Sequence, residues 1–255
     1  MEQIAHQLAL GREQARALAG VAEVNLADSA FNATELETLG YGCAGVFPLY
    51  LDFKRLRAAP DRALLAKYAD GLVNILFVGR GAPNKCLDDV LAAFYYFQKY
   101  VEPQSRLIHA GSYTGLESYQ ALLLTRVHDW QLSNVELTGS IPQAQLNACY
   151  RSAHVFLSMS EHEGFCIPLI EAMVHDVPVL AFAAGAVPET LAGAGVLFKE
   201  KRFDLVAEML GRLGHDAGLR DAVLARQRER LDLYEHRDLE TELRAHLAPL
   251  LEPRG

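Results

Sequence analysis

The sequence predicts an α/β fold in which a parallel sheet is covered by helices on both faces. Two observations support this prediction. From about residue 73, short β-branched runs alternate with longer amphipathic stretches, and glycine-containing polar loops follow several of the runs. Strands that alternate with helices at this spacing form βαβ units, whose strands are parallel. The 255 residues are 51% hydrophobic, so the chain can bury a sizeable core.

Six β-branched or aromatic runs predict the strands of the sheet. In chain order they are residues 73–78, 106–110, 134–138, 154–159, 178–182 and 195–198. Apolar residues at helical spacing predict the helices between them, at residues 88–100, 116–130, 142–150 and 167–175. Pro142 suits the first turn of its helix. The pattern is helical from residue 203 to the end, so we expect a Rossmann-like, doubly wound sheet followed by a helical tail.

The first part of the chain fits this pattern less well. It predicts a helix, a strand, a second helix and an extended connector, at residues 1–20, 21–26, 32–39 and 46–53. A β/α piece of this size is too small to be a domain. We therefore expect residues 1–50 to be the remnant of an N-terminal domain plus a linker. Residues 51–255 would then form a C-terminal domain.

The overall charge is acidic, with a net charge of −8 and a sequence pI near 5.6. This balance argues against a nucleic-acid-binding surface and against a basic membrane patch. It does not exclude an anionic small ligand, because a diphosphate needs only a few local cations and backbone N–H groups.

The cysteines and histidines give no metal signature. The four cysteines are far apart, without a C-x-x-C pair, and the nine histidines have no metal-ligand spacing. We therefore expect reduced thiols and no bound metal. The start of the chain does not resemble a signal peptide, and no apolar run approaches the roughly 18 residues that span a bilayer. These features predict a cytoplasmic protein.

One candidate site follows the predicted strand at residues 154–159. Open α/β sheets bind ligands at the carboxyl ends of their strands, where the turn S-E-H-E-G falls. Gly164 would let a ligand approach the backbone. The next three N–H groups would face that ligand at the start of a helix, which suits a phosphate. They belong to Phe165, Cys166 and Ile167.

Two glutamates flank this turn. Glu171 lies about one helical turn farther along, where a carboxylate can accept hydrogen bonds from both hydroxyls of a ribose. Glu163, in the loop, can accept from the hydroxyls of a sugar. Two glutamates at this spacing would ordinarily be solvated surface acids. The surrounding E-G-F-C-I-P-L-I-E-A-M, followed by P-V-L-A-F and P-E-T, favours a binding site instead.

A second candidate site is the loop V-G-R-G-A-P-N-K at residues 78–85. Gly79 begins the loop, and Arg80 and Lys85 are cations suited to a diphosphate. The loop lacks the spacing of a P-loop. Asn84 also stands where a dinucleotide fingerprint has its third glycine, which disfavours a nicotinamide-dependent enzyme. Alone, the loop would more often be a solvated turn; beside the glutamate segment, phosphate binding is favoured.

Three further features lie at predicted strand ends. Backbone groups of Ser140 and Ile141, in L-T-G-S-I-P, can meet the edge of a nucleobase, although an ordinary turn explains them equally well. The loop A-G-A-V-P-E-T at residues 184–190 belongs to the same edge, where Glu189 would support the Glu171 region. His109 precedes a glycine at a strand end, so both a structural and a functional role stay open.

These motifs together resemble a known family. The order G-R-x-x-x-N-K, then T-G after a strand, then E-G-F-x-x-P-x-x-E-A-M and P-E is similar to the C-terminal, donor-binding half of retaining GT-B glycosyltransferases of family 4, also called group 1. The resemblance covers most of residues 73–200 and, more weakly, residues 25–55. The element with two glutamates is highly specific in its E-G-F-x-x-P context, and the G-R…K loop moderately so.

The resemblance implies a role for each motif residue. Glu163 would contact the donor sugar, and Glu171 the ribose. Arg80 and Lys85 would stabilise the diphosphate as charge develops on the leaving group, and the amides at residues 165 and 166 would hold the phosphates. The family needs no catalytic metal and transfers its sugar with retention, through front-face attack in which the leaving phosphate assists deprotonation of the acceptor.

The resemblance also implies partners. It predicts a GDP- or UDP-sugar donor, with mannose from GDP as the first expectation. It further predicts a glycan or lipid-linked acceptor in polysaccharide or lipopolysaccharide biosynthesis. The acceptor domain would carry any association with the inner face of the membrane. Apolar residues among the first fifty suit self-association, hence a homodimer.

The chain departs from the family in two ways. Cys166 stands where many members have glycine, although its backbone N–H is retained. In addition, little of an acceptor domain precedes the donor motifs. An alternative function is therefore a non-catalytic nucleotide-sugar-binding module, or a donor half that needs a separate acceptor domain.

Overall fold

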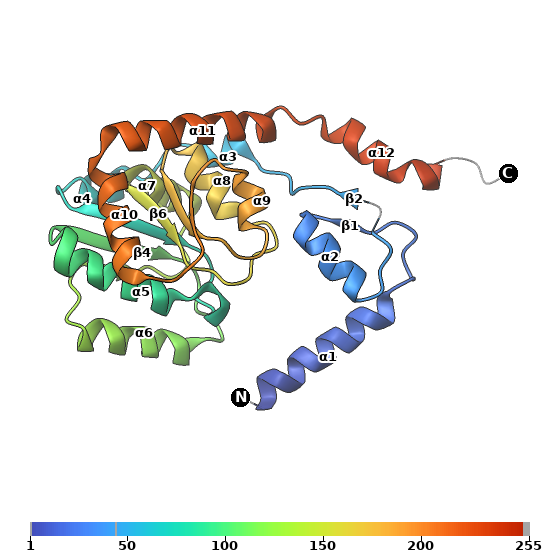
Figure 1. Ribbon diagram of the computed structural model, residues 1–255, viewed down its shortest axis with the longest axis horizontal. Coiled ribbons are helices and arrows are strands. Elements are labelled where there is room, and N and C mark those ends of the chain that lie inside the picture. The colour runs from blue at the N-terminus through green and yellow to red at the C-terminus, as the bar shows by residue number, and fades with distance from the viewer. Residues whose placement is uncertain (1, 44, 252–255) are drawn as a thin grey trace. The chain divides into compact units, whose positions relative to one another are not determined.

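The computed structural model describes residues 2–43 and 45–251, which form two compact units (Figure 1). One unit combines Met1–Tyr50 with His236–Gly255, and the other is Leu51–Glu235. The sequence places a boundary after residue 50 and assigns everything beyond it to one domain. In the structure, residues 236–255 belong instead with the first fifty.

The larger unit contains a six-stranded sheet in the order β5-β4-β3-β6-β7-β8, and every pair of neighbours is parallel. Its strands are β3 (Val73–Val78), β4 (Ser105–Ala110), β5 (Val135–Leu137), β6 (Val155–Ser158), β7 (Val179–Phe182) and β8 (Val196–Phe198). All residues of β4 and β6 are buried, as expected for parallel strands with both faces covered. The predicted α/β fold class is confirmed.

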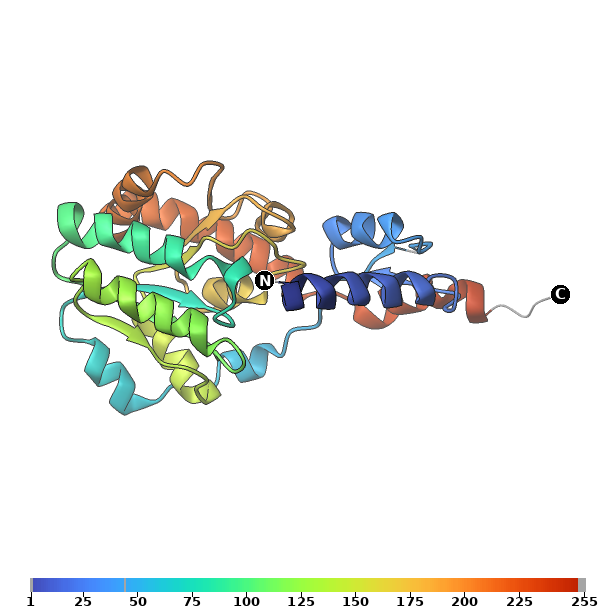
Figure 2. The same cartoon turned by 90° about the horizontal axis from the view of Figure 1, so that it is seen from below.

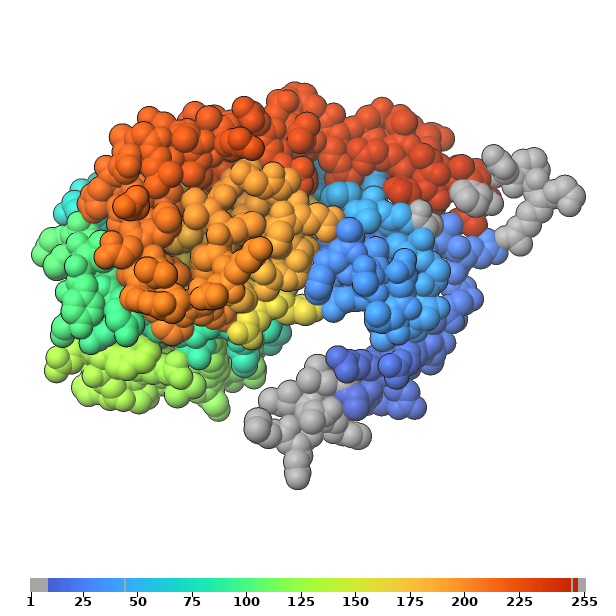
Figure 3. Space-filling view, viewed as in Figure 1, coloured from blue at the N-terminus to red at the C-terminus, as the bar shows by residue number. Residues whose placement is uncertain are grey.

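Helices cover both faces of this sheet, as Figures 1 and 2 show. On one face lie α5 (Leu87–Tyr96), its π-helical continuation η2 (Phe97–Val101), α6 (Glu117–Asp129) and α10 (Phe203–His215). On the other face lie α4 (Arg62–Tyr68), α7 (Gln143–Ser152) and α8 (Ile167–Val174), with the short α3 (Phe53–Leu56) packed against α7 and α8. The long α11 (Ala217–Glu235) contacts both α8 and α10, and forms with α10 much of the orange surface of this unit in Figure 3.

The predicted helices at residues 88–100, 116–130, 142–150 and 167–175 are all present. Three short α-helices of the described residues were not predicted: α3, α4 and α9 (Val187–Leu191). They are four, seven and five residues long, so they are too short to show a helical period in the sequence.

The order of the strands places a topological switch point at the edge of the sheet, where doubly wound folds form a crevice for ligands. β3 lies at the centre, the chain continues to β4 and β5 on one side, and it then returns to β6, β7 and β8 on the other. The strand order therefore reverses between β3 and β6. Doubly wound sheets bind ligands outside the carboxyl ends of their strands at such a point. The loops that follow β3 and β6 contain the two motifs singled out in the sequence.

The smaller unit contains α1 (Glu2–Leu18), α2 (Ala30–Thr38), α12 (Leu239–Leu251) and a two-stranded parallel sheet of β1 (Leu26–Ala27) and β2 (Gly45–Val46). Within it, Arg237 donates to the carbonyl of Pro48 at 2.8 Å and covers the ring of Phe47. A Cβ atom at Gly45 would lie 2.4 Å from the ring of His246 on α12. These contacts explain why residues 236–255 belong to this unit.

The prediction of a strand at residues 21–26 was wrong. Of these residues, only Leu26 is in a strand, and the preceding ones form turns and bends. The side chain of Asn25 donates to the carbonyl of Gly42 at 3.1 Å, which fixes an irregular backbone just before β1. None of the helices in the described part of the chain combines the length and apolar character needed to cross a membrane.

Candidate functional site

The loops after β3 and β6 are bonded to each other across the crevice. The backbone N–H of Glu161 donates to the carbonyl of Asn84 at 3.0 Å, and the Asn84 side chain donates to the carbonyl of His162 at 3.4 Å. The ammonium of Lys85 lies 2.8 Å from Oε2 of Glu163. Two residues predicted to form the site, 78 positions apart in the chain, are thus in direct contact.

The Lys85–Glu163 pair is largely shielded from water. The two side chains are 21% and 9% exposed. A cation beside a hydrogen-bond acceptor suits a ligand in which a phosphate is joined directly to a sugar, because the phosphate and the sugar hydroxyls are then a few ångströms apart. Since the pair is partly buried, removing either partner would leave an uncompensated charge.

The backbone at the start of α8 is oriented by a residue in the left-handed region. Cys166 has φ 63°, and its side chain makes no capping hydrogen bond to α8. The start of the helix is therefore without a side-chain cap, although the N–H of Leu169 is bonded to the Cys166 carbonyl at 3.1 Å. Gly164, Phe165 and Ile167 lie with Cys166 in this loop-to-helix segment, as the sequence predicted.

The loop at residues 184–190 holds the Glu163 segment from the other side. The N–H of Ala186 donates to the carbonyl of Glu163 at 2.9 Å, and the hydroxyl of Thr190 donates to the carbonyl of Phe165 at 2.5 Å. Gly185 has φ +56°, and a Cβ atom there would lie 2.5 Å from the Glu163 carbonyl oxygen. These contacts show the loop supporting Glu163 and Phe165, whereas the sequence led us to expect support for the Glu171 region.

Glu171 lies on α8 and is partly buried. One of its oxygens, Oε2, accepts a hydrogen bond of 2.7 Å from the hydroxyl of Tyr150 on α7. Burial raises the pKa of Glu171, while the Tyr150 hydrogen bond and the charge of Arg55 oppose this effect. Tyr150 was not singled out in the sequence, because it precedes Glu171 by 21 positions and belongs to another helix.

Arg80 lies on the same loop as Lys85 but has a different partner. Its guanidinium donates to the carbonyl of Thr114 at 3.0 Å, and its side chain is exposed. The N–H of the neighbouring Gly81 donates to Ser112 at 2.9 Å. The first part of the loop, which begins at Gly79, is therefore attached to the β4–α6 connection. The structure brings Lys85 and Glu163 together but places the Arg80 guanidinium on this connection.

His109, on β4, contacts the first residue of the loop that contains Arg80 and Lys85. Its Nε2 lies 2.8 Å from the carbonyl of Gly79, and its Nδ1 lies 2.7 Å from the hydroxyl of Tyr113. A carbonyl oxygen only accepts, so Nε2 carries the proton, and Nδ1 accepts from Tyr113. Burial lowers the pKa of His109 to about 4, so the ring is neutral near pH 7. Of the two roles left open in the sequence, these contacts give it the structural one.

Ser140 and Ile141 lie between β5 and α7, at the same edge of the sheet. Their loop is hydrogen-bonded to the loop that follows β4, because the N–H of Gly111 donates to the carbonyl of Gly139 at 3.0 Å. Ser140 is exposed and Ile141 half-buried. Since β4 lies between β5 and β3, these two residues are farther from the crevice than Lys85.

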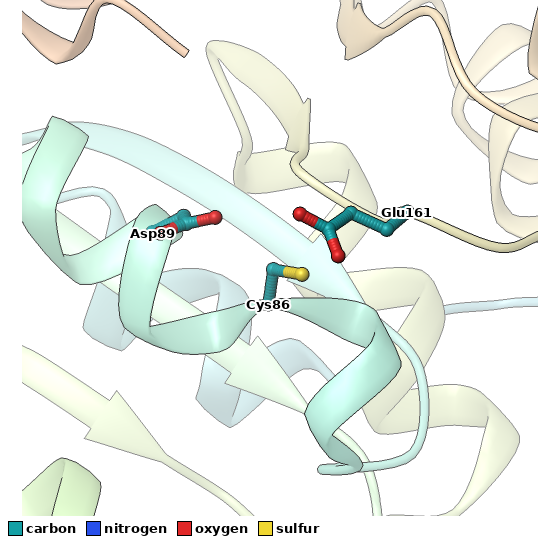
Figure 4. Close-up of side chains that lie close together, drawn as sticks. All are labelled: Cys86, Asp89 and Glu161. Carbon is teal, nitrogen blue, oxygen red and sulfur yellow. The ribbon is translucent and has the colours of Figure 1, made fainter.

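Cys86, Asp89 and Glu161 form a group of potential metal ligands on the α5 side of the crevice (Figure 4). Their ligand atoms lie within 4.8 Å of one another. The ammonium of Lys201, however, lies 2.6 Å from Asp89 and 2.7 Å from Glu161. Burial raises the pKa of the Cys86 thiol, which favours its neutral form. A lysine therefore already supplies the cation here, and it links the Glu161 loop to α5.

Comparison with known proteins agrees with this fold. The family model of the group 1 glycosyl transferases matches residues 68–230, and the chain belongs to this family. The O-antigen chain mannosyltransferase B of Escherichia coli is 26% identical over 154 residues, which are 59% of this chain and 39% of the relative. The GDP-mannose:cellobiosyl-diphosphopolyprenol alpha-mannosyltransferase of Xanthomonas oryzae pv. oryzae is 30% identical over 171 residues, or 62% of this chain and 43% of the relative. The chain thus spans less than half the length of these two relatives.

Solved structures show the same fold. HepE from Anabaena, in complex with UDP and glucose, has a TM-score of 0.76 at 16% identity and covers 95% of this chain and 67% of its own. The C-terminal domain of a group 1 family protein (LpcC) from Francisella tularensis has a TM-score of 0.59 at 22% identity and covers 72% of this chain and 97% of its own. The sheet thus has the Rossmann-like fold of GT-B glycosyltransferases.

Proposed function

We propose that this chain holds the nucleotide-sugar donor of a retaining glycosyltransferase of family 4. The sugar is a hexose, with mannose from GDP as the leading candidate, and the acceptor is a glycan or a lipid-linked glycan in polysaccharide or lipopolysaccharide biosynthesis. The ion pair between Lys85 and Glu163 at the crevice is the observation that carries this proposal. The names of the two mannosyltransferase relatives favour mannose.

We assign the parts of the donor along the edge of the sheet. The diphosphate lies against Lys85 and the backbone N–H groups at residues 165–167, and the sugar hydroxyls donate to Glu163. The ribose hydroxyls donate to Glu171, and the base lies toward Ser140 and Ile141. Arg80 reaches the diphosphate if its guanidinium leaves the carbonyl of Thr114.

The chemistry follows from this arrangement. The bond between the anomeric carbon and the distal phosphate breaks, and Lys85 and Arg80 stabilise the negative charge that develops on the leaving nucleoside diphosphate. The acceptor hydroxyl attacks from the same face, and its proton passes to the leaving phosphate, so the configuration is retained. No metal is required, and we expect donor binding to be unchanged by EDTA.

The proposal is tested by isothermal titration of the purified chain. GDP, UDP and ADP are compared with their sugar conjugates, and at least one pair should bind more tightly than about millimolar. Glu171→Ala should weaken free nucleotide and nucleotide sugar alike. Glu163→Ala should weaken the nucleotide sugar and spare the free nucleotide. Wild-type chain that binds none of these ligands would refute the proposal, and equal effects of both substitutions on both ligands would refute the division of roles.

A second candidate function is that of a donor-binding half. The observation that favours it is that the chain spans less than half the length of each of the two mannosyltransferase relatives. In this case the 255 residues bind the nucleotide sugar but transfer it only with a separate acceptor domain. Transfer needs two domains to close around the donor, which orients the substrates and excludes water. We expect binding without robust turnover by the isolated chain. Sustained turnover without a partner would contradict this second function.

A further inference from the structure

Tyr150 is a buried aromatic residue directly behind Glu171. It lies on α7 and is 1% exposed. Its ring stacks on that of His175, with centroids 5.3 Å apart and planes at 13°, and on that of Phe156, at 6.2 Å and 20°. These two stacked contacts and the dense core leave the ring a single orientation.

This orientation directs the hydroxyl of Tyr150 toward the start of α8. The hydroxyl donates to Oε2 of Glu171 at 2.7 Å, and the carbonyl of Pro168 lies 3.4 Å away. Burial, followed by the charge of Glu171, raises the pKa of Tyr150 far above its ordinary value, so the phenol keeps its proton and stays a donor.

The hydrogen bond fixes where the Glu171 carboxylate can point. A glutamate has three rotatable bonds, and an unrestrained one would have to lose that freedom when it binds a ligand. With Oε2 held by Tyr150, Oε1 and the remaining lone pair of Oε2 can accept from two neighbouring hydroxyls. A ribose diol presents two donors at this spacing, and a deoxyribose does not.

We propose that Tyr150 positions Glu171 for the ribose and so makes the site selective for ribonucleotides over deoxyribonucleotides. This inference rests on the proposed function, in which Glu171 contacts the ribose. Tyr150 itself would touch no ligand atom; it acts through the carboxylate.

The test compares Tyr150→Phe with the wild-type chain by isothermal titration. The substitution keeps the stacked ring and removes only the hydroxyl. The probes are GDP and its 2′,3′-dideoxy analogue, which keeps the base and the phosphates; UDP and its analogue are used if UDP binds more tightly. We expect Tyr150→Phe to weaken the ribonucleotide about tenfold, or roughly 1.4 kcal/mol, because the freed glutamate must then lose its rotamer freedom when it binds. Binding of the dideoxy analogue should change less than about twofold.

The chain offers a matched control at the other end of the sheet. Tyr68 is also buried, and its hydroxyl donates to Oε2 of Glu136 at 2.9 Å. Tyr68→Phe removes a similar hydrogen bond away from the crevice and should leave the affinity of both probes unchanged. In a double-mutant cycle, Tyr150→Phe should have no further effect once Glu171→Ala is present, because both substitutions act through the same carboxylate.

The outcomes separate this inference from the proposed function. Equal weakening of both probes by Tyr150→Phe would mean that the tyrosine only stabilises the fold, and would overturn the inference. Unchanged ribonucleotide binding in Tyr150→Phe, with weakened binding in Glu171→Ala, would overturn it as well. Wild-type chain that binds neither probe would overturn the proposed function and, with it, the role of Tyr150.

Discussion

The close approach of Gly185 to the Glu163 loop gives a sharp prediction. In Gly185→Ala, the new Cβ atom would lie 2.5 Å from the carbonyl oxygen of Glu163 and 2.9 Å from its nitrogen. Both neighbours are backbone atoms, so they cannot rotate away, and ordinary contact begins at 3.4 Å. The Glu163 loop must therefore move by up to about 1 Å, and overpacking of this kind costs about 1–3 kcal/mol.

The backbone conformation adds a second, separable cost. Gly185 has φ +56°, where an alanine is strained by roughly 1–2 kcal/mol. Gly193 has φ +83° but no heavy atom within 4 Å of its would-be Cβ, so Gly193→Ala carries the strain without the collision. We expect Gly193→Ala to lower the free energy of unfolding by roughly 1 kcal/mol and Gly185→Ala by about 3 kcal/mol.

The functional effect should be confined to the sugar. Because the collision displaces Glu163, Gly185→Ala should weaken nucleotide-sugar binding about tenfold and free nucleotide much less, whereas Gly193→Ala should spare both. Urea denaturation measures the unfolding free energies, and isothermal titration measures the affinities. Equal losses of stability in the two variants, or an unchanged affinity for the nucleotide sugar in Gly185→Ala, would show that the 184–190 loop does not position Glu163.

Two other predictions concern buried charge. Burial lowers the pKa of His109 to about 4 in the fold, against about 6.5 in the unfolded chain. Between these two pH values the unfolded chain binds a proton that the folded chain does not. The free energy of unfolding should therefore fall by about 3 kcal/mol for this residue as the pH is lowered from about 6.5 toward 4. Urea denaturation from pH 7 to 4 should show a smaller loss of unfolding free energy in His109→Gln than in the wild-type chain. Equal losses in the two proteins would contradict this prediction. Lys201→Ala should leave Cys86, Asp89 and Glu161 without their cation, so that the variant, but not the wild type, binds Cd²⁺ in isothermal titration. Binding by neither or by both would contradict the role given to Lys201.

The sheet could be predicted from sequence because local pattern determines it. β3 and β6 are short runs in which every residue but one is apolar, bounded by polar turns, and such runs stay recognisable without their partners. The segment at residues 21–26 fitted the pattern less well, and the hydrogen bond from Asn25 to Gly42 that holds it is a contact that no local pattern encodes.

The candidate site could likewise be predicted only where its residues carry a local sequence pattern. The motif residues Lys85 and Glu163 could be found because their loops have unusual local sequences. The sequence could not show which of the two cations contacts the glutamate. Tyr150 could not be found at all, because it acts through one hydroxyl on a partner 21 positions away. Thr190 lies in a loop that the sequence singled out, but its bond to the carbonyl of Phe165 could not be predicted. Such supporting residues have no sequence signature of their own, since their effect arises only when the helices pack.

The cysteine at position 166 shows how a departure from a motif can leave the geometry intact. A residue with φ 63° is most easily a glycine, which explains why the family motif often has one there. A cysteine accepts this conformation at a cost of roughly 1–2 kcal/mol. Its side chain is buried, and burial, together with the charge of Glu163, raises the pKa of the thiol well above its usual value, so it brings no charge into the site. Under the proposed function, the ligand needs only the direction of the backbone N–H at this position. That direction is set by φ and by the hydrogen bonds of the flanking loops rather than by the identity of the side chain.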